Sequence, residues 1–286
     1  MAPDTVCSVG VAGIGLLGPG LPGWAAARGL LANPAQWRCT PTEVPASTRL
    51  PPTERRRAGA VVKASLVVAD EACAGAGLDP ALLATVFASS TGDPLNCHLL
   101  CEALAQPQRL VSPTRFTNSV HNAPAGYWHI AAQSTCASTS LAAFDASFGA
   151  GLLEAAVQCA SGGEAVLLVA CDMPYPEPLH ALRPLADGFA VALVLVPAGR
   201  GAASGGGVAL PLLSLLSLPV GESSDRLDTP CADPGLEGLR QSIPAARALP
   251  FLCALASATG EVSLVIDDAP GHSSGWRLHA VAEPQP

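Results

Sequence analysis

The chain has 286 residues, of which 49% are hydrophobic and only 13% charged, so it has enough apolar material for one large domain or two modest ones. Its net charge of −8 argues against binding to nucleic acid or to anionic lipid. No apolar run reaches the length of a membrane span, and the first thirty residues lack the basic region of a secretory signal. We therefore expect a globular protein of the cytoplasm.

The ten cysteines are scattered along the chain without a C-x-x-C pair, which argues against a structural zinc site or a disulfide framework. Cys97 and Cys101 are four residues apart with His98 beside them, but no second pair of ligands accompanies them. We expect no metal and no cofactor, and we expect most of the cysteines to be small buried apolar residues.

The first third of the chain predicts a strand, a helix and then a second strand and helix. Residues 6–17, VCSVGVAGIGLL, favour a buried strand that opens into glycines. Gly10, Gly13 and Gly15 are spaced G-x-x-G-x-G, which is not the dinucleotide-binding pattern. Residues 50–77 predict a helix that contains Arg55, Arg56 and Arg57, either as a solvated face or as a docking spot for an acidic partner.

The next elements alternate between strand and helix. A strand is predicted within ALLATVFASST (81–91) and a helix over PLNCHLLCEALA (94–105). Further helices are predicted over residues 123–132 and 138–159, the second of them long and Ala-rich. EAVLLVAC (164–171) and FAVALVLVPAG (189–199) are continuous apolar runs, typical of central strands.

Beyond Arg200 the pattern becomes less regular. GAASGGG (201–207) indicates a turn or linker, and LPLLSLLSLPV (210–220) one more strand. A helix over residues 236–255 and a strand over VSLVI (262–266) complete the expected elements, and no internal repeat is present.

Several of these segments occur in an order that resembles a known family. SPTRF (112–116), HNAPAG (121–126), TCASTSL (135–141) and GGEAVLLVACD (162–172) resemble the N-terminal half of a β-ketoacyl synthase of the thiolase fold. The likeness covers roughly residues 5–200. It implies a layered α/β/α fold, with a ketosynthase-like domain over residues 1–205 and a shortened, divergent part over 206–286 that completes or covers the same domain.

Two segments are similar to a narrower group within that family. LPPTERRR (50–57) and SVHNA (119–123) look like the short ketosynthase-like proteins, described as chain-length factors, of aryl polyene and xanthomonadin-type pigment pathways. The resemblance implies a subunit that pairs with an active ketosynthase as a heterodimer. It also implies contact with an acyl carrier protein, either indirectly or through Arg55–Arg57.

The family's chemistry depends on a cysteine at the N-terminus of a buried helix, where the helix dipole favours the thiolate. Overlaid on the family pattern Thr-Ala-Cys-Ser-Ser-Ser-Leu, residues 135–141 place Cys136 on the Ala position and Ala137 on the nucleophile position. One residue turns a helical side chain by about 100°, so we assign no catalytic residue. A local shift of the backbone could still bring the thiol of Cys136 to the nucleophile position. The alternative therefore stays open that the protein is a minimal condensing enzyme or acyltransferase that uses Cys136.

The remaining candidates for catalysis lack the expected context. The family's His-Gly-Thr-Gly-Thr loop does not occur after residue 200, so His272 and His279 are expected on the surface. His121 and His129 precede the TCASTSL segment (135–141). His121 could either touch a cavity wall or be a hydrogen-bonded polar residue at a packed turn. Ser138 and Ser140 lack a G-x-S-x-G context, which argues against a hydrolase.

The resemblance thus implies a catalytically silent subunit that limits the length of the partner's acyl chain. The residues that we expect at the interface or in the tunnel wall are Phe116, Val120, His121, Ala123, Tyr127 and Ala137. The alternative for the first five is that they are simply core residues. An acyl-binding module without a ketosynthase partner is a third possibility.

Overall fold

The computed structural model describes residues 5–198, 212–216, 229–257, 261–265 and 277–281. Its centre is a six-stranded sheet of order β3-β2-β4-β5-β1-β6. The strands are β1 (Thr5–Leu17), β2 (Ala84–Ala88), β3 (Ser138–Leu141), β4 (Val166–Asp172), β5 (Phe189–Pro197) and β6 (Leu212–Leu216). β2 is parallel to both β3 and β4, whereas β5 runs antiparallel to β4 and β1. A separate pair joins β7 (Glu261–Val265) to β8 (Arg277–Val281).

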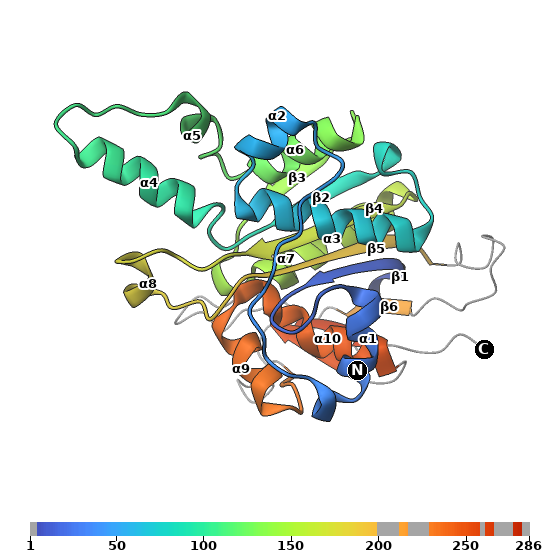
Figure 1. Ribbon diagram of the computed structural model, residues 1–286. Helices are drawn as coiled ribbons and strands as arrows, with labels where there is room; N and C mark the ends of the chain where they lie inside the picture. The colour runs from blue at the N-terminus through green and yellow to red at the C-terminus, as the bar shows by residue number, and fades with distance from the viewer. Residues whose placement is uncertain (1–4, 199–211, 217–228, 258–260, 266–276, 282–286) are drawn as a thin grey trace.

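Helices cover both faces of the sheet, as Figure 1 shows. One face carries α3 (Ala60–Ala76) and α6 (Ala123–Ala132), with α2 (Pro52–Arg57) beside them. The other face carries α7 (Ser147–Gly162) and α10 (Leu249–Ser257), together with α1 (Trp24–Ala32) and α9 (Pro234–Ser242). Three further helices, α4 (Pro94–Ala105), α5 (Pro113–Thr117) and α8 (Leu179–Leu182), lie outside these layers. The layered α/β/α architecture expected from the resemblance is confirmed.

The sheet is buried on both faces, so its central strands contribute to two cores. In β5, Val191 and Leu193 join the core under α7, whereas Ala192 and Val194 join the core under α3. This two-sided burial explains why β4 and β5 appear in the sequence as continuous apolar runs. Residues 236–256 add Leu236 and other side chains to the core under α7. The domain boundary expected near residue 205 lies outside the described residues and stays a prediction.

The glycines of β1 have a packing role. A Cβ atom on Gly13 would collide with the backbone oxygen of Ala72, and one on Gly15 with that of Val68, so only glycine lets β1 lie this close to α3. These glycines therefore serve strand–helix packing.

Glu71 of α3 ties two other elements to the same helix. Its carboxylate accepts the backbone N–H of Leu16 at 2.9 Å, of Trp24 at 2.6 Å and of Ala25 at 3.4 Å. It thereby joins the end of β1 to the first turn of α1, where otherwise unbonded N–H groups favour an anion.

The helices predicted over residues 94–105 and 123–132 are confirmed with the same boundaries. The helix predicted over 50–77 is divided, because Ala58 is extended and α3 begins only after Gly59. The helix predicted over 236–255 is likewise divided into α9, a short 3-10 segment (Pro244–Ala248) and α10.

The prediction of one helix over residues 138–159 is wrong in its first part. Ser138–Leu141 form β3, a 3-10 turn follows over Phe144–Ala146, and the helix α7 begins only at Ser147. The cause is pairing with β2, in which the hydroxyl of Thr85 donates to that of Ser138 at 2.8 Å. Tertiary pairing thus decides the conformation of a segment whose local sequence does not.

Candidate functional site: the turn after β3, the sheet edge and the arm

The connection from β3 to α7 is the strand-to-helix turn that leads into a buried helix. α7 has eight buried residues, including Phe148 and Leu152. At the turn Phe144 has a backbone φ of 50°, in the left-handed region that non-glycine residues rarely adopt. Such outliers cluster at functional sites. The side chain of Phe144 is 61% exposed. In a condensing enzyme of the resembled family, this is the kind of position that carries the nucleophilic cysteine.

No nucleophile is present at this turn. Residues 142–146 are Ala-Ala-Phe-Asp-Ala. The first hydroxyl after them, on Ser147, accepts the backbone N–H of Ala143 at 3.0 Å and donates to the carbonyl of Phe144 at 2.7 Å. Ser147 is buried, so its hydroxyl holds the shape of the turn and does not face a substrate.

Two arginines from other segments cover the turn. The guanidinium of Arg183 lies 3.9 Å from the ring centroid of Phe144 and 2.6 Å from Oδ1 of Asp145. Arg247 approaches the other oxygen of Asp145 at 3.9 Å. A cation over an aromatic face and an ion pair to the next residue together hold the turn in place.

Cys136 does not occupy a helix N-terminus. It lies before β3, with Sγ 3.5 Å from the carbonyl oxygen of Ala81, and its backbone N–H donates to the hydroxyl of Ser134 at 3.2 Å. Ala137 is exposed beside it. The overlay that put Ala137 on the nucleophile position is therefore wrong, because a strand and not a helix follows it.

The other predicted site residues fall into two groups. Phe116 and Val120 are 69% and 53% exposed. His121 and Tyr127 are half-buried and satisfied: Nε2 of His121 donates to the carbonyl of Ser89 at 3.1 Å, and the hydroxyl of Tyr127 donates to Oδ1 of Asn118 at 3.2 Å. Ala123 is half-buried at the start of α6. The structure does not bring any of these residues to Cys136.

The remaining histidines do not assemble a site in the part of the chain that is described. Nδ1 of His129 lies 3.0 Å from the carbonyl of Ser134. His272 and the side chain of His279 lie outside the described residues. Within those residues no group of three or more His, Cys, Asp or Glu could hold a metal ion, and no helix is long and apolar enough to cross a bilayer.

β3 forms one edge of the sheet, and its backbone geometry shows which groups face outward. The N–H of Thr85 donates to the carbonyl of Ala137 at 3.0 Å, and that of Ser89 to the carbonyl of Leu141 at 3.2 Å. Since backbone groups alternate along a strand, those of Ser138 and Ser140 point away from β2. No strand of the described chain pairs with that side.

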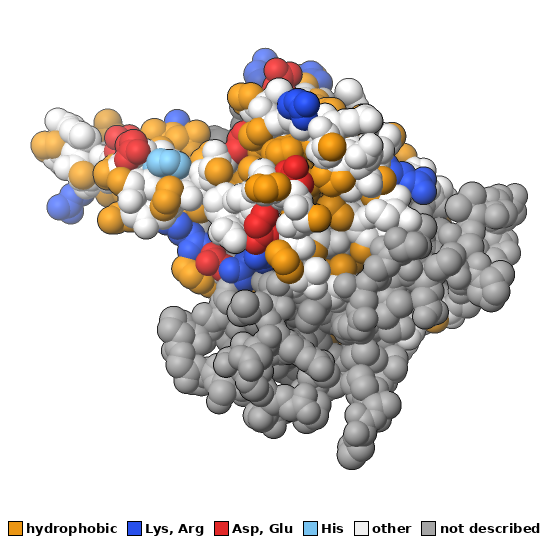
Figure 2. All heavy atoms as spheres, turned by 90° about the horizontal axis from the view of Figure 1, so that it is seen from below, with side chains coloured by type: hydrophobic (Ala, Val, Ile, Leu, Met, Phe, Trp, Pro, Cys, Tyr) orange, Lys and Arg blue, Asp and Glu red, His pale blue; other side chains and the backbone are white. Residues whose placement is uncertain are grey.

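The segment that follows β2 projects from the body of the protein. We call residues 93–122, which contain α4 and α5, the arm; it stands clear of the layers in Figure 1, and Figure 2 shows hydrophobic side chains along it. In α4 only Pro94 and Asn96, both in the first turn, are buried. The large exposed hydrophobic residues of the arm are Leu95, Leu104, Leu110, Phe116 and Val120. Phe116 and Val120 were predicted from the sequence, whereas the three leucines were not.

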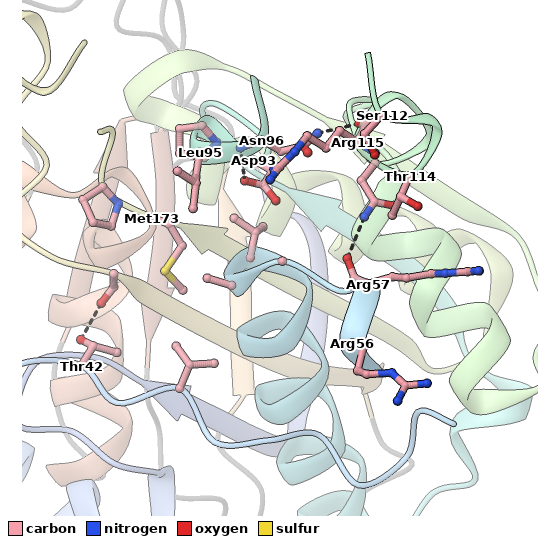
Figure 3. A pocket seen from close by; sticks show the side chains of 18 of the residues that line it. Thr42, Arg56, Arg57, Asp93, Leu95, Asn96, Ser112, Thr114, Arg115 and Met173 are labelled. Carbon is pink, nitrogen blue, oxygen red and sulfur yellow. Dashed lines mark hydrogen bonds between the residues drawn. The ribbon is translucent and has the colours of Figure 1, made fainter. Parts of the chain in front are cut away.

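A cavity of about 610 Å³ opens at the base of the arm. Its apolar part includes Val61 and Met173, and Arg56, Arg57 and Arg115 line it too, as Figure 3 shows. Asp93 lies beside Arg115; burial raises the pKa of Asp93, while the backbone N–H of Asn96 and the charge of Arg115 oppose that rise. Two arginines of the predicted basic cluster, Arg56 and Arg57, thus lie at a concave surface.

Comparison with known proteins agrees with this geometry. Residues 30–208, more than half of the chain, match the family model described as β-ketoacyl synthase, N-terminal domain. A ketosynthase (ApeO) in complex with its chain length factor (ApeC) from Xenorhabdus doucetiae is similar, with 21% identity and a TM-score of 0.68 over 96% of this chain and 99% of that one. The ishigamide ketosynthase/chain length factor is also similar, with 16% identity and a TM-score of 0.67 over 97% of this chain and 100% of that one.

A third solved structure, AntDE:AntF, is a type II PKS acyl-carrier protein in complex with its ketosynthase; it gives 16% identity and a TM-score of 0.59 over 72% of this chain and 67% of that one. No curated protein matches the sequence significantly. At these identities the solved structures establish the fold, and the family model establishes membership. The chain belongs to the family of β-ketoacyl synthase N-terminal domains.

Proposed function

We propose that this protein is a catalytically silent, chain-length-factor type of subunit that pairs with an active β-ketoacyl synthase and shapes its acyl tunnel. The observation that carries the proposal is the sequence Ala-Ala-Phe-Asp-Ala at the turn between β3 and α7. Condensation needs a thiolate to take up the acyl chain and further groups to stabilise the developing enolate. This turn has no thiol, and the guanidinium of Arg183 lies over the ring of Phe144 within it.

The similar solved structures support the pairing. In two of them a ketosynthase is together with a chain length factor, and nearly all of this chain matches nearly all of one chain in each. We infer a heterodimer here, and we place it in an aryl polyene-type pathway because LPPTERRR (50–57) and SVHNA (119–123) resemble proteins of those pathways.

The edge of β3 is the surface that we assign to strand pairing with the ketosynthase. Ser138 and Ser140 present their backbone N–H and C=O groups outward, and an unpaired edge is a ready template for another strand. Exposed apolar residues flank the edge on both sides, Ile130 on α6 and Val157 on α7. A partner strand with flanking helices would bury both.

The arm supplies the tunnel wall in this proposal. Phe116 and Val120 are large, apolar and exposed, so they can reach a neighbouring subunit and block the end of its acyl tunnel by volume. His121, Ala123 and Tyr127 are half-buried, and the first and last of them are hydrogen-bonded to Ser89 and Asn118, so they support the end of the arm. Exposed Ala137 directly precedes the pairing edge. Burial of the arm's exposed leucines would add apolar contact area at about 25 cal/mol per Å².

Contact with an acyl carrier protein is confined, in this proposal, to the basic residues at the cavity. Carrier proteins are acidic and would be repelled by a chain of net charge −8. Arg56, Arg57 and Arg115 provide a local exception. The nine described cysteines are free, which suits a reducing compartment, and we place the protein in the cytoplasm.

The test is co-expression with the ketosynthase encoded beside this chain, with co-purification and product profile as readouts. We expect the pair to co-purify and Cys136→Ser to leave product formation unchanged. Phe116→Ala should lengthen the product and Phe116→Trp should shorten it. Loss of activity in Cys136→Ser with the complex intact would instead indicate an enzyme that uses this thiol. Failure to bind any ketosynthase would indicate an acyl-binding module.

A further inference from the structure

The two ends of the arm meet at the short loop 89–92, which lies between β2 and the arm. The arm begins directly after this loop, and its other end returns to it, because Nε2 of His121 donates to the carbonyl of Ser89 at 3.1 Å. A Cβ on Gly92, whose φ is 69°, would lie 3.7 Å from Cδ2 of His121. The loop therefore contacts the arm at its start and near its end.

One buried carboxyl group holds this loop. Asp172, at the end of β4, is 1% exposed. Its Oδ1 accepts the backbone N–H of Ser90 at 2.8 Å, the hydroxyl of Ser90 at 2.8 Å and the hydroxyl of Ser89 at 3.1 Å. The hydroxyl of Ser89 in turn accepts the N–H of Thr91 at 3.3 Å and that of Gly92 at 3.0 Å. The three N–H groups between Ser89 and the arm thus depend on Asp172, directly or through Ser89.

The carboxyl group and the loop stabilise one another. Burial raises the pKa of Asp172, and the hydrogen bonds from Ser90 and Ser89 oppose that rise. A carboxyl group that loses its hydration inside a protein is stable there only where donors replace the water. We call Asp172, Ser89 and Ser90 the clamp, because the removal of one of them leaves the others without partners.

The outer part of the arm contributes little to its own placement. None of residues 97–117, all of which the structure describes, is buried. The amide of Asn96 donates to the carbonyl of Arg115 at 2.8 Å and joins the two sides of the arm. The amide of Asn118 donates to the carbonyl of Arg57 at 3.0 Å and joins the arm to the body. Since these contacts lie at or near the base of the arm, the base decides where the arm points.

We propose that Asp172 is a positioning residue, which fixes the direction of the arm through the clamp and thereby sets where Phe116 and Val120 close the acyl tunnel of the ketosynthase. The inference rests on the proposed function, which assigns these two side chains to the tunnel wall. Val120 immediately precedes His121, which is bonded to the loop. Loss of the clamp should therefore spread the product over several lengths, whereas loss of volume at Phe116 shifts it to greater length.

Hydrogen exchange of the full chain tests the clamp without any partner. In Asp172→Ala we expect the amides at the two ends of the arm, residues 89–96 and 118–122, to exchange about tenfold faster than in the wild type, because the buried hydrogen bonds that close the loop are lost. The amides of β5 should exchange as in the wild type. Unchanged exchange at both ends of the arm would overturn the proposal.

A milder variant decides the question if Asp172→Ala does not fold. Ser89→Ala removes the hydroxyl that binds the N–H groups of Thr91 and Gly92, and it should raise exchange at the same two ends. Ser257→Ala is the matched control, because it removes an exposed hydroxyl that donates to the carbonyl of Cys253 on α10, away from the arm. The control should exchange as the wild type does, and equal exchange in Ser89→Ala and Ser257→Ala would refute the role of the clamp.

Co-expression with the ketosynthase tests the effect on the product. We expect Asp172→Ala and Ser89→Ala to give several product lengths from an intact complex. Asp172→Asn keeps an oxygen to which Ser90 can donate, so it should restore most of the wild-type distribution. A loss of stability alone would lower the yield and leave the distribution of lengths unchanged.

The same experiment separates this inference from the proposed function. A single, wild-type length from both Asp172→Ala and Ser89→Ala, in a complex where Phe116→Ala does lengthen the product, would overturn the inference and leave the proposed function in place. An unchanged length in Phe116→Ala itself would refute the assignment of the arm to the tunnel wall, and with it this inference.

Discussion

A proline at position 140 removes one backbone N–H on the outward side of β3 and leaves the bonds to β2 in place. The N–H and C=O of Ser140 point away from β2, because the carbonyls of Ala137 and Leu141 are those that accept from it. Proline is tolerated on an edge strand where its nitrogen faces solvent, and the preceding residue is already extended, as proline requires. Ser140→Pro should therefore fold and lose only its pairing capacity.

The expected loss follows from one missing hydrogen bond at a buried interface. A partner carbonyl left without its donor costs about 1–3 kcal/mol, which corresponds to a roughly 5- to 150-fold weaker dissociation constant. Sedimentation equilibrium of the purified pair measures this constant. Ser140→Ala keeps the N–H and should bind as the wild type does, whereas Thr139→Pro removes an N–H that faces β2 and should damage the folded chain itself. Equal affinities for Ser140→Pro and Ser140→Ala would refute pairing through this edge.

Three further predictions concern stability. Glu71→Ala leaves three backbone N–H groups without their acceptor, so we expect urea denaturation to give a free energy of unfolding lower by about 1–3 kcal/mol; no change would mean that water replaces the carboxylate at no cost. Gly15→Ala forces a methyl group onto the backbone of α3 and should lower the free energy of unfolding by about 1–3 kcal/mol or more. At Gly29 a Cβ meets nothing within 4 Å, so Gly29→Ala should instead raise the free energy of unfolding by up to about 1 kcal/mol. Similar effects of the two changes would contradict the close approach of β1 to α3. The ion pair with Arg240 lowers the pKa of Glu237 from 4.5 to about 2, so its contribution is complete above pH 4.5 and is lost as the pH falls towards 2. The stability difference between wild type and Glu237→Gln, followed by denaturation at a series of pH values, should shrink over that interval, and a difference that is constant with pH would count against the ion pair.

The parts of the fold that the sequence predicted well are those with a single strong local signal. β4 and β5 are unbroken apolar runs, and α4 and α6 have a proline near their first residue and small or polar residues after the last. Residues 138–147 carry no such signal, because Ala, Ser and Thr suit either a helix or a strand there. Pairing with β2, some fifty residues upstream, decides the outcome.

The site was harder to predict for the same reason. A helix over residues 138–141 would put the strand-to-helix turn at Cys136 and Ala137, whereas the strand found there moves the turn to Phe144 and Asp145. The contacts of Arg183 and Arg247 with this turn are made by segments distant in sequence, and no local pattern announces them. The exposed face of α4 did have a signal: PLNCHLLCEALA contains no Lys or Arg, although almost none of the helix is buried.

The central claim is that this chain never carries the acyl group. Mass mapping of the complex with its ketosynthase during turnover tests it most directly, since a thioester adds the mass of the acyl chain to the peptide that bears it. We predict acyl groups on the ketosynthase and the carrier protein only, with Cys136 and every other cysteine of this chain unmodified by acyl. An acyl thioester on any peptide of this chain, formed and consumed at the rate of product formation, would contradict the account.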